Sequence, residues 1–141
     1  MPQIWDKNLP STTRFTILPE FNNEAVRDNN TGLVWERAPI GGGTWAEATL
    51  EAIQKQVAGT TGWRLPSIVE LNSLRDPSLP PPSIPSAIFN VNGDFWSATT
   101  LADDSSHAWF LSFQMGAIGK SGKGMSLLVW CVRGPMQESA Y

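Results

Sequence analysis

The sequence predicts an α+β fold. Two helix starts lie close together in the first half of the chain, at Thr44 and Ser67. Strand-like segments follow after residue 87, and consecutive strands are typical of an antiparallel sheet. The sequence shows no internal repeat, and its 141 residues suit one domain. We therefore expect a single domain, residues 1–141, with helices and antiparallel strands in separate stretches.

The first expected elements are short strands. Residues 14–18 form a strand-like segment between Pro10 and Pro19, within an N-terminal extension of residues 1–24. Two further strand-like segments, 25–28 and 33–36, flank turn-forming residues. Because the connection is short, we expect these two segments to form a β-hairpin.

The first long helix is predicted to start at Thr44. Glu47 stands three residues later, which makes a capping box, and Gly59 is a natural stop. Apolar residues recur at helical spacing along this helix, and we expect them to face the core. These residues are Ala46, Leu50, Ile53 and Val57.

The second helix is predicted to start sharply at Ser67. Pro66 disfavours helix before it, and Ser67 with Glu70 forms a second capping box. The helix should end before Asp76, and residues 77–86 should form an extended loop rich in proline and serine.

Strands are expected after this loop. Residues 94–99 and 108–113 have strand patterns, and residues 116–124 indicate a turn with a short strand at 117–118. Residues 127–132 form a nearly continuous apolar run, which is typical of a central strand buried on both faces.

Composition limits the classes of function. The net charge of −3 argues against a nucleic-acid binder, which would carry a basic stripe. No apolar run approaches the ~20 residues of a membrane-spanning helix, so we expect no membrane insertion. Cys131 is the only cysteine in the sequence, which excludes an intrachain disulfide and a zinc site built on cysteines.

The compartment stays open at this point. The N-terminal residues lack the basic and apolar blocks of a signal peptide. Either the protein stays in the cytoplasm, or the sequence is a mature fragment of an exported protein. In the second case we expect an extracellular or cell-surface location.

Several motifs resemble one family when they are taken in order. Residues 28–35 (DNNTGLVW) resemble its opening motif, and residues 44–48 (TWAEA) resemble its helix start. Residues 63–71 (WRLPSIVEL) match its central motif, and residues 95–99 (FWSAT) resemble a later strand. Together with Cys131, these motifs resemble the C-terminal domain family of bacterial collagen-like adhesins, over a core of residues 26–134.

This resemblance implies a fold and a biological setting. It implies a C-type-lectin-like α+β fold, related to the formylglycine-generating-enzyme type, in which two helices flank a small twisted antiparallel sheet. Family members are usually secreted or surface-attached, and the adhesin members bind sulfated polysaccharides. The motif positions Trp63, Arg64, Pro66, Glu70, Trp96, Trp109 and Cys131 are expected to have structural roles, and residues 135–141 to form a tail.

The chain departs from the resembled pattern at one point. Many relatives carry a cysteine in the first helix that could pair with the cysteine of the last strand. Here that helix has Ala48, Ala52 and Ile53, which leaves Cys131 alone and weakens the inference of an extracellular location.

Enzymatic activity is not expected. His107 is the only histidine, and no recognised nucleophile motif accompanies it. The copper-dependent oxidase activity of formylglycine-generating relatives needs two cysteines, and this chain has one.

A metal site has weak support. Asn90, Asn92 and Asp94 alternate and offer oxygen atoms that suit calcium, but turn formation explains them more simply. We therefore expect no cofactor, with calcium as the alternative.

Two loops are candidates for ligand binding. One carries Asp103, Asp104 and His107, and the other carries Lys120 and Lys123 in a glycine-rich setting. The two lysines could contact a sulfate or carboxylate as point charges, although a solvated hairpin tip explains them too.

We expect a non-catalytic ligand-recognition module at a cell or phage surface, with a glycan or protein ligand. The alternative is a structural or assembly module of a larger surface protein, with no small-ligand site. A homo-oligomer, in particular a trimer, would accompany that alternative.

Overall fold

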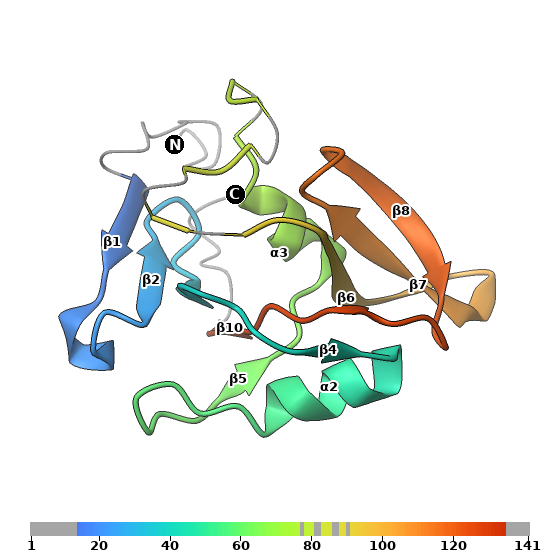
Figure 1. Ribbon diagram of the computed structural model, residues 1–141, viewed down its shortest axis with the longest axis horizontal. Helices are drawn as coiled ribbons and strands as arrows, with labels where there is room; N and C mark the ends of the chain where they lie inside the picture. Colours follow the sequence, from blue (N-terminus) through green and yellow to red (C-terminus); the bar gives the residue numbers. More distant parts are fainter. Residues whose placement is uncertain (1–13, 77, 81–82, 86–87, 90, 135–141) are drawn as a thin grey trace, which may run out of the picture.

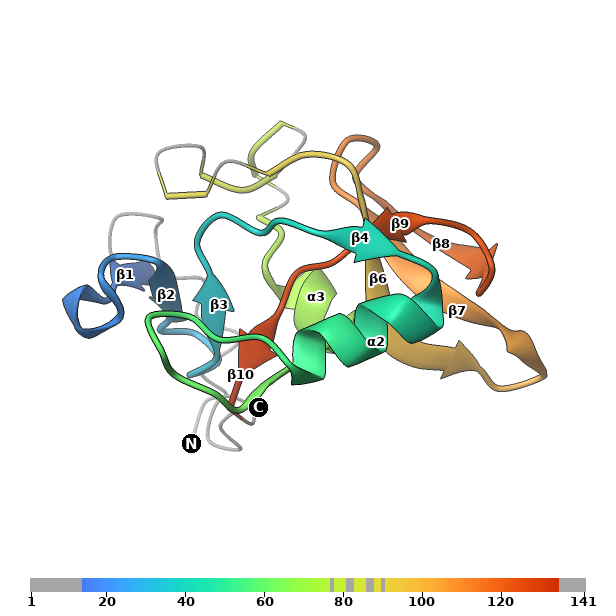
Figure 2. The ribbon, with the colours of Figure 1, turned by 60° about the horizontal axis from the view of Figure 1, so that its bottom comes forward.

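The computed structural model describes residues 14–76, 78–80, 83–85, 88–89 and 91–134 (Figure 1). Within these ranges the regular secondary structure is mostly β-strand, arranged in two five-stranded sheets. Figure 2 shows the two sheets side by side, and we call them sheet A and sheet B.

Sheet A brings together segments from both ends of the described chain. Its order is β1-β2-β3-β10-β5, and each neighbouring pair is antiparallel. The hairpin predicted from residues 25–36 is confirmed as β2 and β3. The strands are β1 (Phe15–Ile17), β2 (Ala25–Asp28), β3 (Val34–Glu36), β10 (Val132–Arg133) and β5 (Trp63–Arg64).

Sheet B contains the longer strands. Its order is β4-β9-β6-β7-β8, and β6 pairs with β9 in parallel while the other pairs are antiparallel. The segment expected to be mostly turn, residues 116–124, instead contains a six-residue strand. The strands are β4 (Gly42–Gly43), β9 (Leu127–Leu128), β6 (Asp94–Leu101), β7 (Asp104–Ser112) and β8 (Ala117–Gly122).

Both predicted helix starts are confirmed. Helix α2 (Trp45–Ile53) begins after Thr44 and helix α3 (Ile68–Ser73) after Ser67, and each has a complete capping box. A short 3-10 helix, η2 (Pro19–Phe21), follows β1. No helix within the described ranges is long and apolar enough to cross a membrane.

The predicted core face of α2 is wrong. The helix buries Ala48 and Ala52, whereas Leu50 is 55% exposed and Ile53 is 62% exposed. The two alanines let the helix approach a cluster that already contains the large rings of Trp63 and Trp96. The helix therefore turns its small side chains, Ala48 and Ala52, toward the large rings of the core.

The core consists of two clusters. One surrounds Trp130, whose ring centroid lies 5.2–5.5 Å from the rings of Phe89, Phe95, Phe113 and Trp35. The other cluster lies under α2 and contains Trp96 and Cys131. Most of the aromatic residues are thus core residues, as composition suggested.

The expected fold, a C-type-lectin-like α+β domain with two helices flanking one small sheet, is wrong. The structure is mostly β, with two five-stranded sheets. The run 127–132 is also not one central strand, because β9 lies in sheet B and β10 in sheet A. Residues 129–131 cross between the sheets, and burial of this crossing explains the apolar run.

Candidate functional site

Strands β7 and β8 place an aromatic ring beside a lysine on one face of sheet B. Trp109 lies directly opposite Lys120 in the antiparallel register, so both side chains point to the same face. His107 lies two residues before Trp109 and points to that face as well. Lys120 is exposed, and the other two are partly exposed. We call these three residues the β7–β8 face.

Trp109 is partly exposed although it occupies the middle of a strand. Leu111, two residues on, points to the same face and is fully buried in the Trp130 cluster. Trp109 belongs to neither core cluster. Within the described ranges its ring makes no stacking or cation–π contact. Part of Trp109 is therefore open to solvent.

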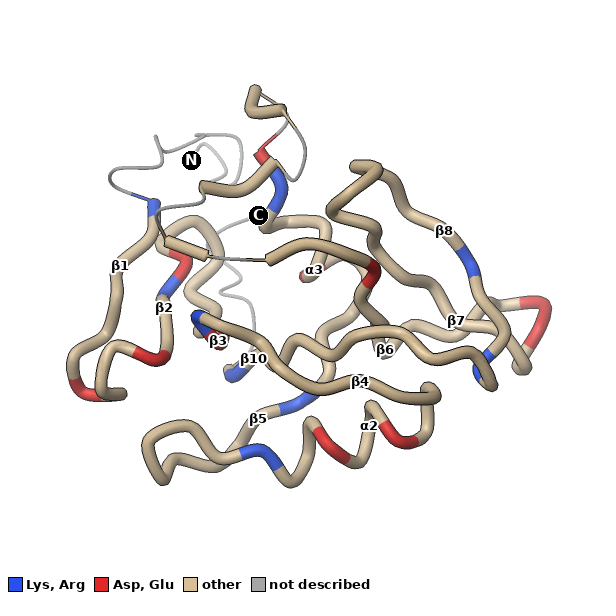
Figure 3. The backbone as a smooth tube through the Cα atoms, viewed as in Figure 1, with Lys and Arg blue, Asp and Glu red and all other residues tan. Residues whose placement is uncertain are grey.

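The two candidate lysines have different surroundings, because Lys120 lies within β8 and Lys123 lies in the turn just after it. The Nζ atom of Lys123 lies 4.0 Å from the centroid of the Trp45 ring, a cation–π contact. Trp45 packs against the cluster that contains Ala108, the neighbour of Trp109 on the opposite face. Lys123 therefore fastens the end of β8 to the start of α2, and only Lys120 belongs to the β7–β8 face. Figure 3 shows the basic positions along β8.

The acidic candidates lie at the turn between β6 and β7. Asp104 accepts a hydrogen bond from the Ser106 amide at 3.0 Å, and its Oδ2 lies 2.8 Å from Nδ1 of His107. Hydrogen bonds from the Ser106 hydroxyl and amide, and then the nearby His107, lower the pKa of Asp104. Asp103 is exposed beside them. Asp104 and His107 thus support the turn, and Nε2 of His107 stays on the side of the ring away from Asp104.

The central motif holds three parts of the chain together. The Arg64 guanidinium donates two hydrogen bonds of 2.7 Å to the Glu70 carboxylate and one of 2.7 Å to the Gly134 carbonyl. Glu70 also accepts from the Ser67 amide as part of the capping box. Burial raises the pKa of Glu70, but the hydrogen bonds from Arg64 and Ser67 outweigh it, so this pKa lies below its ordinary value.

The other motif residues make interior contacts. The Trp63 indole donates to the Thr60 carbonyl at 2.9 Å, and the Trp96 indole donates to the Gly43 carbonyl at 2.9 Å. The Pro66 carbonyl accepts from the Ala98 amide at 2.7 Å, which joins the start of α3 to β6. Trp109 differs from these motif residues because it is partly exposed.

A buried carboxylate lies where the two sheets meet. Glu36 accepts from the Cys131 amide at 2.9 Å, and its other oxygen lies 2.9 Å from Nζ of Lys55. Burial raises the pKa of the Cys131 thiol, and the adjacent Glu36 raises it further, so the thiol is protonated and unreactive in the folded protein. Burial alone would lower the pKa of Lys55, but its hydrogen bond with Glu36 raises it overall.

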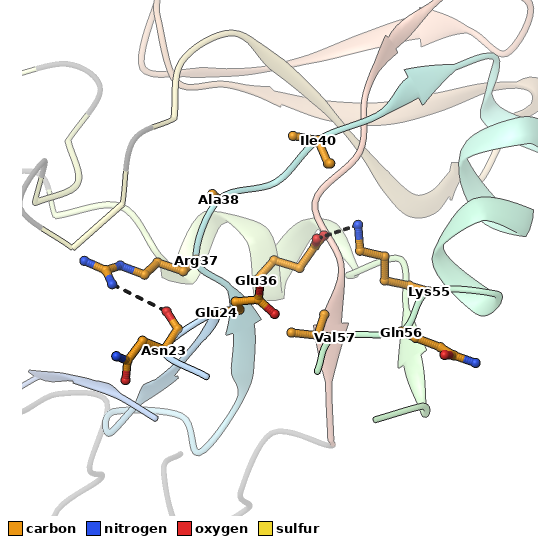
Figure 4. A pocket seen from close by; sticks show the side chains of 9 residues that line it. All are labelled: Asn23, Glu24, Glu36, Arg37, Ala38, Ile40, Lys55, Gln56 and Val57. Atoms are coloured by element: carbon orange, nitrogen blue, oxygen red, sulfur yellow. Dashed lines mark hydrogen bonds and ion pairs between the residues drawn. The ribbon is translucent and has the colours of Figure 1, made fainter. Parts of the chain in front are cut away.

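A surface hollow of about 330 Å³ opens beside this ion pair (Figure 4). Arg37 turns away from the ion pair and donates to the Asn23 and Ile88 carbonyls. The charge of Glu36 is thus already matched by Lys55. The lining residues are Asn23, Glu24, Glu36, Arg37, Ala38, Ile40, Lys55, Gln56 and Val57.

Of the three calcium candidates, Asn92 and Asp94 lie within the described residues. Asn90 lies outside the described residues. Asn92 is exposed, and Asp94 begins β6 and pairs with Ser112. Among the residues that the structure describes, no three His, Cys, Asp or Glu side chains gather closely enough to hold a metal ion. Calcium binding therefore stays a prediction.

The comparison with protein families decides the classification. The model of the Lcl C-terminal domain matches residues 24–133. This chain belongs to the Lcl C-terminal domain family. The match agrees closely with the core of 26–134 expected from the motifs. A search of curated proteins gave no match to the chain.

This Lcl C-terminal domain contains ion pairs that were not predicted from the sequence. Arg14 donates to both carboxylate oxygens of Asp28, at 3.0 and 2.8 Å, and also bonds the Ser73 carbonyl. Sequence reasoning missed this pair and the Glu36–Lys55 pair because their partners are far apart in the chain. Asp28 lies in the opening motif and Glu36 directly follows it, and both have buried apolar residues nearby in the sequence. An acidic residue among apolar ones could have indicated a buried carboxylate that needs a cation.

Proposed function

We propose that this Lcl C-terminal domain is a non-catalytic recognition module that binds a glycan or protein ligand through the β7–β8 face. The observation that carries the proposal is the partly exposed indole of Trp109 opposite the exposed Lys120. Within the described ranges this ring belongs to neither core cluster, which leaves part of it open to a ligand.

The chemistry of the face suits both ligand classes. An indole provides a rigid apolar surface for a sugar ring or an apolar side chain, with an N–H at its edge. Lys120 adds a positive charge for a carboxylate or sulfate, and His107 adds a ring nitrogen. Tryptophan is also enriched among the residues that dominate protein interfaces.

The proposal includes the setting and the absence of catalysis. We propose a surface location, which membership of the Lcl C-terminal domain family supports, and no nucleic acid or cofactor is part of the proposal. The Cys131 thiol is buried and is therefore not accessible to a substrate. Asp104 and Ser106 both contact Nδ1 of His107, and the proposal assigns this histidine to ligand binding through its other nitrogen.

A second candidate function, assembly within a larger surface protein or a trimer, has its own supporting observation. Leu50 and Ile53 project from α2 into solvent, where apolar side chains favour contact with another chain. This candidate needs no small-ligand site.

A glycan array that includes sulfated and uncharged polysaccharides tests the recognition proposal. It should be run at physiological salt, because contacts between exposed charges alone are screened there. We expect specific hits that W109A weakens at least tenfold and K120A weakens several-fold. Parallel runs with calcium and with chelator test the calcium prediction.

Two matched variants control this experiment. M115A removes an exposed apolar side chain from the same hairpin, and R27A removes an exposed cation from sheet A. Both should bind as the wild type does. Hits that W109A leaves unchanged would contradict the proposed face, and a blank array would shift the ligand class to proteins.

A further inference from the structure

Helix α2 exposes apolar side chains on the side that faces away from the protein. Leu50 is 55% exposed and Ile53 is 62% exposed, and they are neighbours because they stand three residues apart. Ala46 is exposed on the same stripe. The helix thus has an apolar stripe at regular spacing, although its buried side uses alanines.

Two acidic side chains lie beside this stripe, Glu47 exposed and Glu51 partly exposed. Glu47 accepts a hydrogen bond from the Thr44 amide, and Glu51 lies near Lys55, but neither carboxylate forms a salt bridge within the described ranges. Glu47 and Glu51 stand four residues apart and lie next to Leu50 around a shallow hollow of about 430 Å³. Lys55, four residues after Glu51, is the natural partner of that carboxylate. Its ammonium instead lies 2.9 Å from the buried Glu36. Figure 3 shows the acidic positions on α2.

A second apolar residue lies on the far side of these two acidic side chains. The Glu51 carboxylate lies against Gly41, where a Cβ atom would overlap it. The neighbouring Ile40 is 72% exposed. Ile40 also lines the hollow of Figure 4, and that hollow shares Lys55 and Gln56 with the one beside Leu50. The surface is therefore continuous from Ile40 across Glu51 to Leu50.

We propose that this surface, defined by Ile40, Glu47, Leu50, Glu51 and Ile53, docks a partner polypeptide segment that carries Lys or Arg between apolar side chains. The cation would meet Glu51 and Glu47, and the apolar groups would cover Leu50, Ile53 and Ile40. An anionic membrane would be repelled by the two carboxylates. A second copy docked face to face would bring like charges together.

This proposal does not depend on the recognition function. It names a partner chemistry for the assembly candidate, which rests on the same Leu50 and Ile53. Helix α2 packs on the side of sheet B that carries Ala108 and Trp96. The β7–β8 face is on the other side, because Trp109 alternates with Ala108. Loss of binding at one surface therefore leaves the other intact.

Fluorescence anisotropy with a synthetic peptide tests the docking surface. The probe is a labelled peptide of about 16 residues that combines Leu and Lys at helical spacing, and the control peptide has Glu in place of every Lys. At physiological salt we expect the Lys peptide to bind the wild type and the Glu peptide not to bind. The double variant L50Q/I53Q should bind the Lys peptide at least tenfold more weakly.

Two further variants test whether binding depends on the acidic charge or would occur at any exposed apolar side chain. E51Q should weaken binding several-fold and reduce its dependence on salt. V69Q changes an apolar residue of α3 that is 63% exposed and should change nothing. Equal binding of the Glu peptide, unchanged binding by L50Q/I53Q, or no binding of the Lys peptide would each overturn the proposal. Self-association or vesicle binding that L50Q/I53Q abolishes, without peptide binding, would overturn it in favour of another occupant.

Discussion

Arg64 binds two partners that belong to different elements. Its guanidinium joins β5 to the start of α3 through Glu70, and to the end of β10 through the Gly134 carbonyl. The sequence predicted a structural role for Arg64. Its guanidinium makes two hydrogen bonds to a carboxylate and one to a carbonyl.

R64A should lower stability without changing ligand specificity. It removes charge-assisted hydrogen bonds and leaves Glu70 without its cation, but the Arg64 side chain is 39% exposed, so solvent replaces part of the loss. We expect the free energy of unfolding to fall by about 1–2 kcal/mol and the melting temperature by about 3–6 °C. Thermal unfolding of wild type and R64A measures this loss, and an unchanged melting temperature would rule out a stabilising role for Arg64.

The lowered pKa of Glu70 predicts that the stability of the folded protein depends on pH. Its pKa in the folded protein lies below the ordinary 4.5, so its contribution is fully present above about pH 4.5. The contribution is lost as the pH falls through the lower, folded value, where the carboxylate is protonated. Urea unfolding of wild type and E70Q should show a stability gap at pH 7 that narrows below pH 4.5. A gap that is constant down to acid unfolding would contradict this linkage.

At the scale of elements, the orientation of α2 is open to a paired test. L50Q and I53Q alter exposed side chains, so each should change the free energy of unfolding by less than about 0.5 kcal/mol. A52L adds volume at a fully buried position and should cost about 1–3 kcal/mol. Chemical denaturation measures all three. The reverse order of costs would mean that the apolar stripe faces the core, as its periodicity first suggested.

The elements also show what a sequence pattern can and cannot predict. Capping boxes are local, so both helix starts were predictable at Thr44 and Ser67. Strands β4, β5, β9 and β10 have two residues each, too few for any alternating pattern, and their partners are distant. The division of the strands into two sheets was therefore not predictable from periodicity, although the long strands β6 and β7 were.

The candidate site was predictable in part. Lys120 and Lys123 were identified as a pair because residues 116–124 were interpreted mainly as a turn. Lys120 lies within β8 and faces Trp109, whereas Lys123 lies in the turn just after β8 and contacts Trp45, so the two lysines do not share a surface. Recognition of β8 as a strand would have placed Lys120 beside Trp109 instead.

At the scale of the whole molecule, residues 129–131 join the two sheets. Val129, Trp130 and Cys131 are each at most 1% exposed, and Cys131 donates its amide to the buried Glu36. Because this segment is anchored in both sheets, it should open only when the protein unfolds globally.

Thiol labelling tests this expectation. A thiol-reactive disulfide reagent should modify Cys131 at the rate of global unfolding, since the buried thiol has a raised pKa and little access to solvent. The labelling rate should rise with urea in step with the unfolding rate measured by tryptophan fluorescence. Rapid labelling in native buffer would show that the junction of the sheets opens locally.

The central claim is that the molecule recognises its ligand on the β7–β8 face, and amide chemical-shift mapping tests it most directly. The strongest hit from the glycan array would be titrated into the isotopically labelled protein. Our account predicts shifts at His107, Trp109 and Lys120, with α2 and Lys55 unaffected, and loss of these shifts in W109A. Shifts that centre on Lys55 or on α2, with the β7–β8 amides unchanged, would contradict the account.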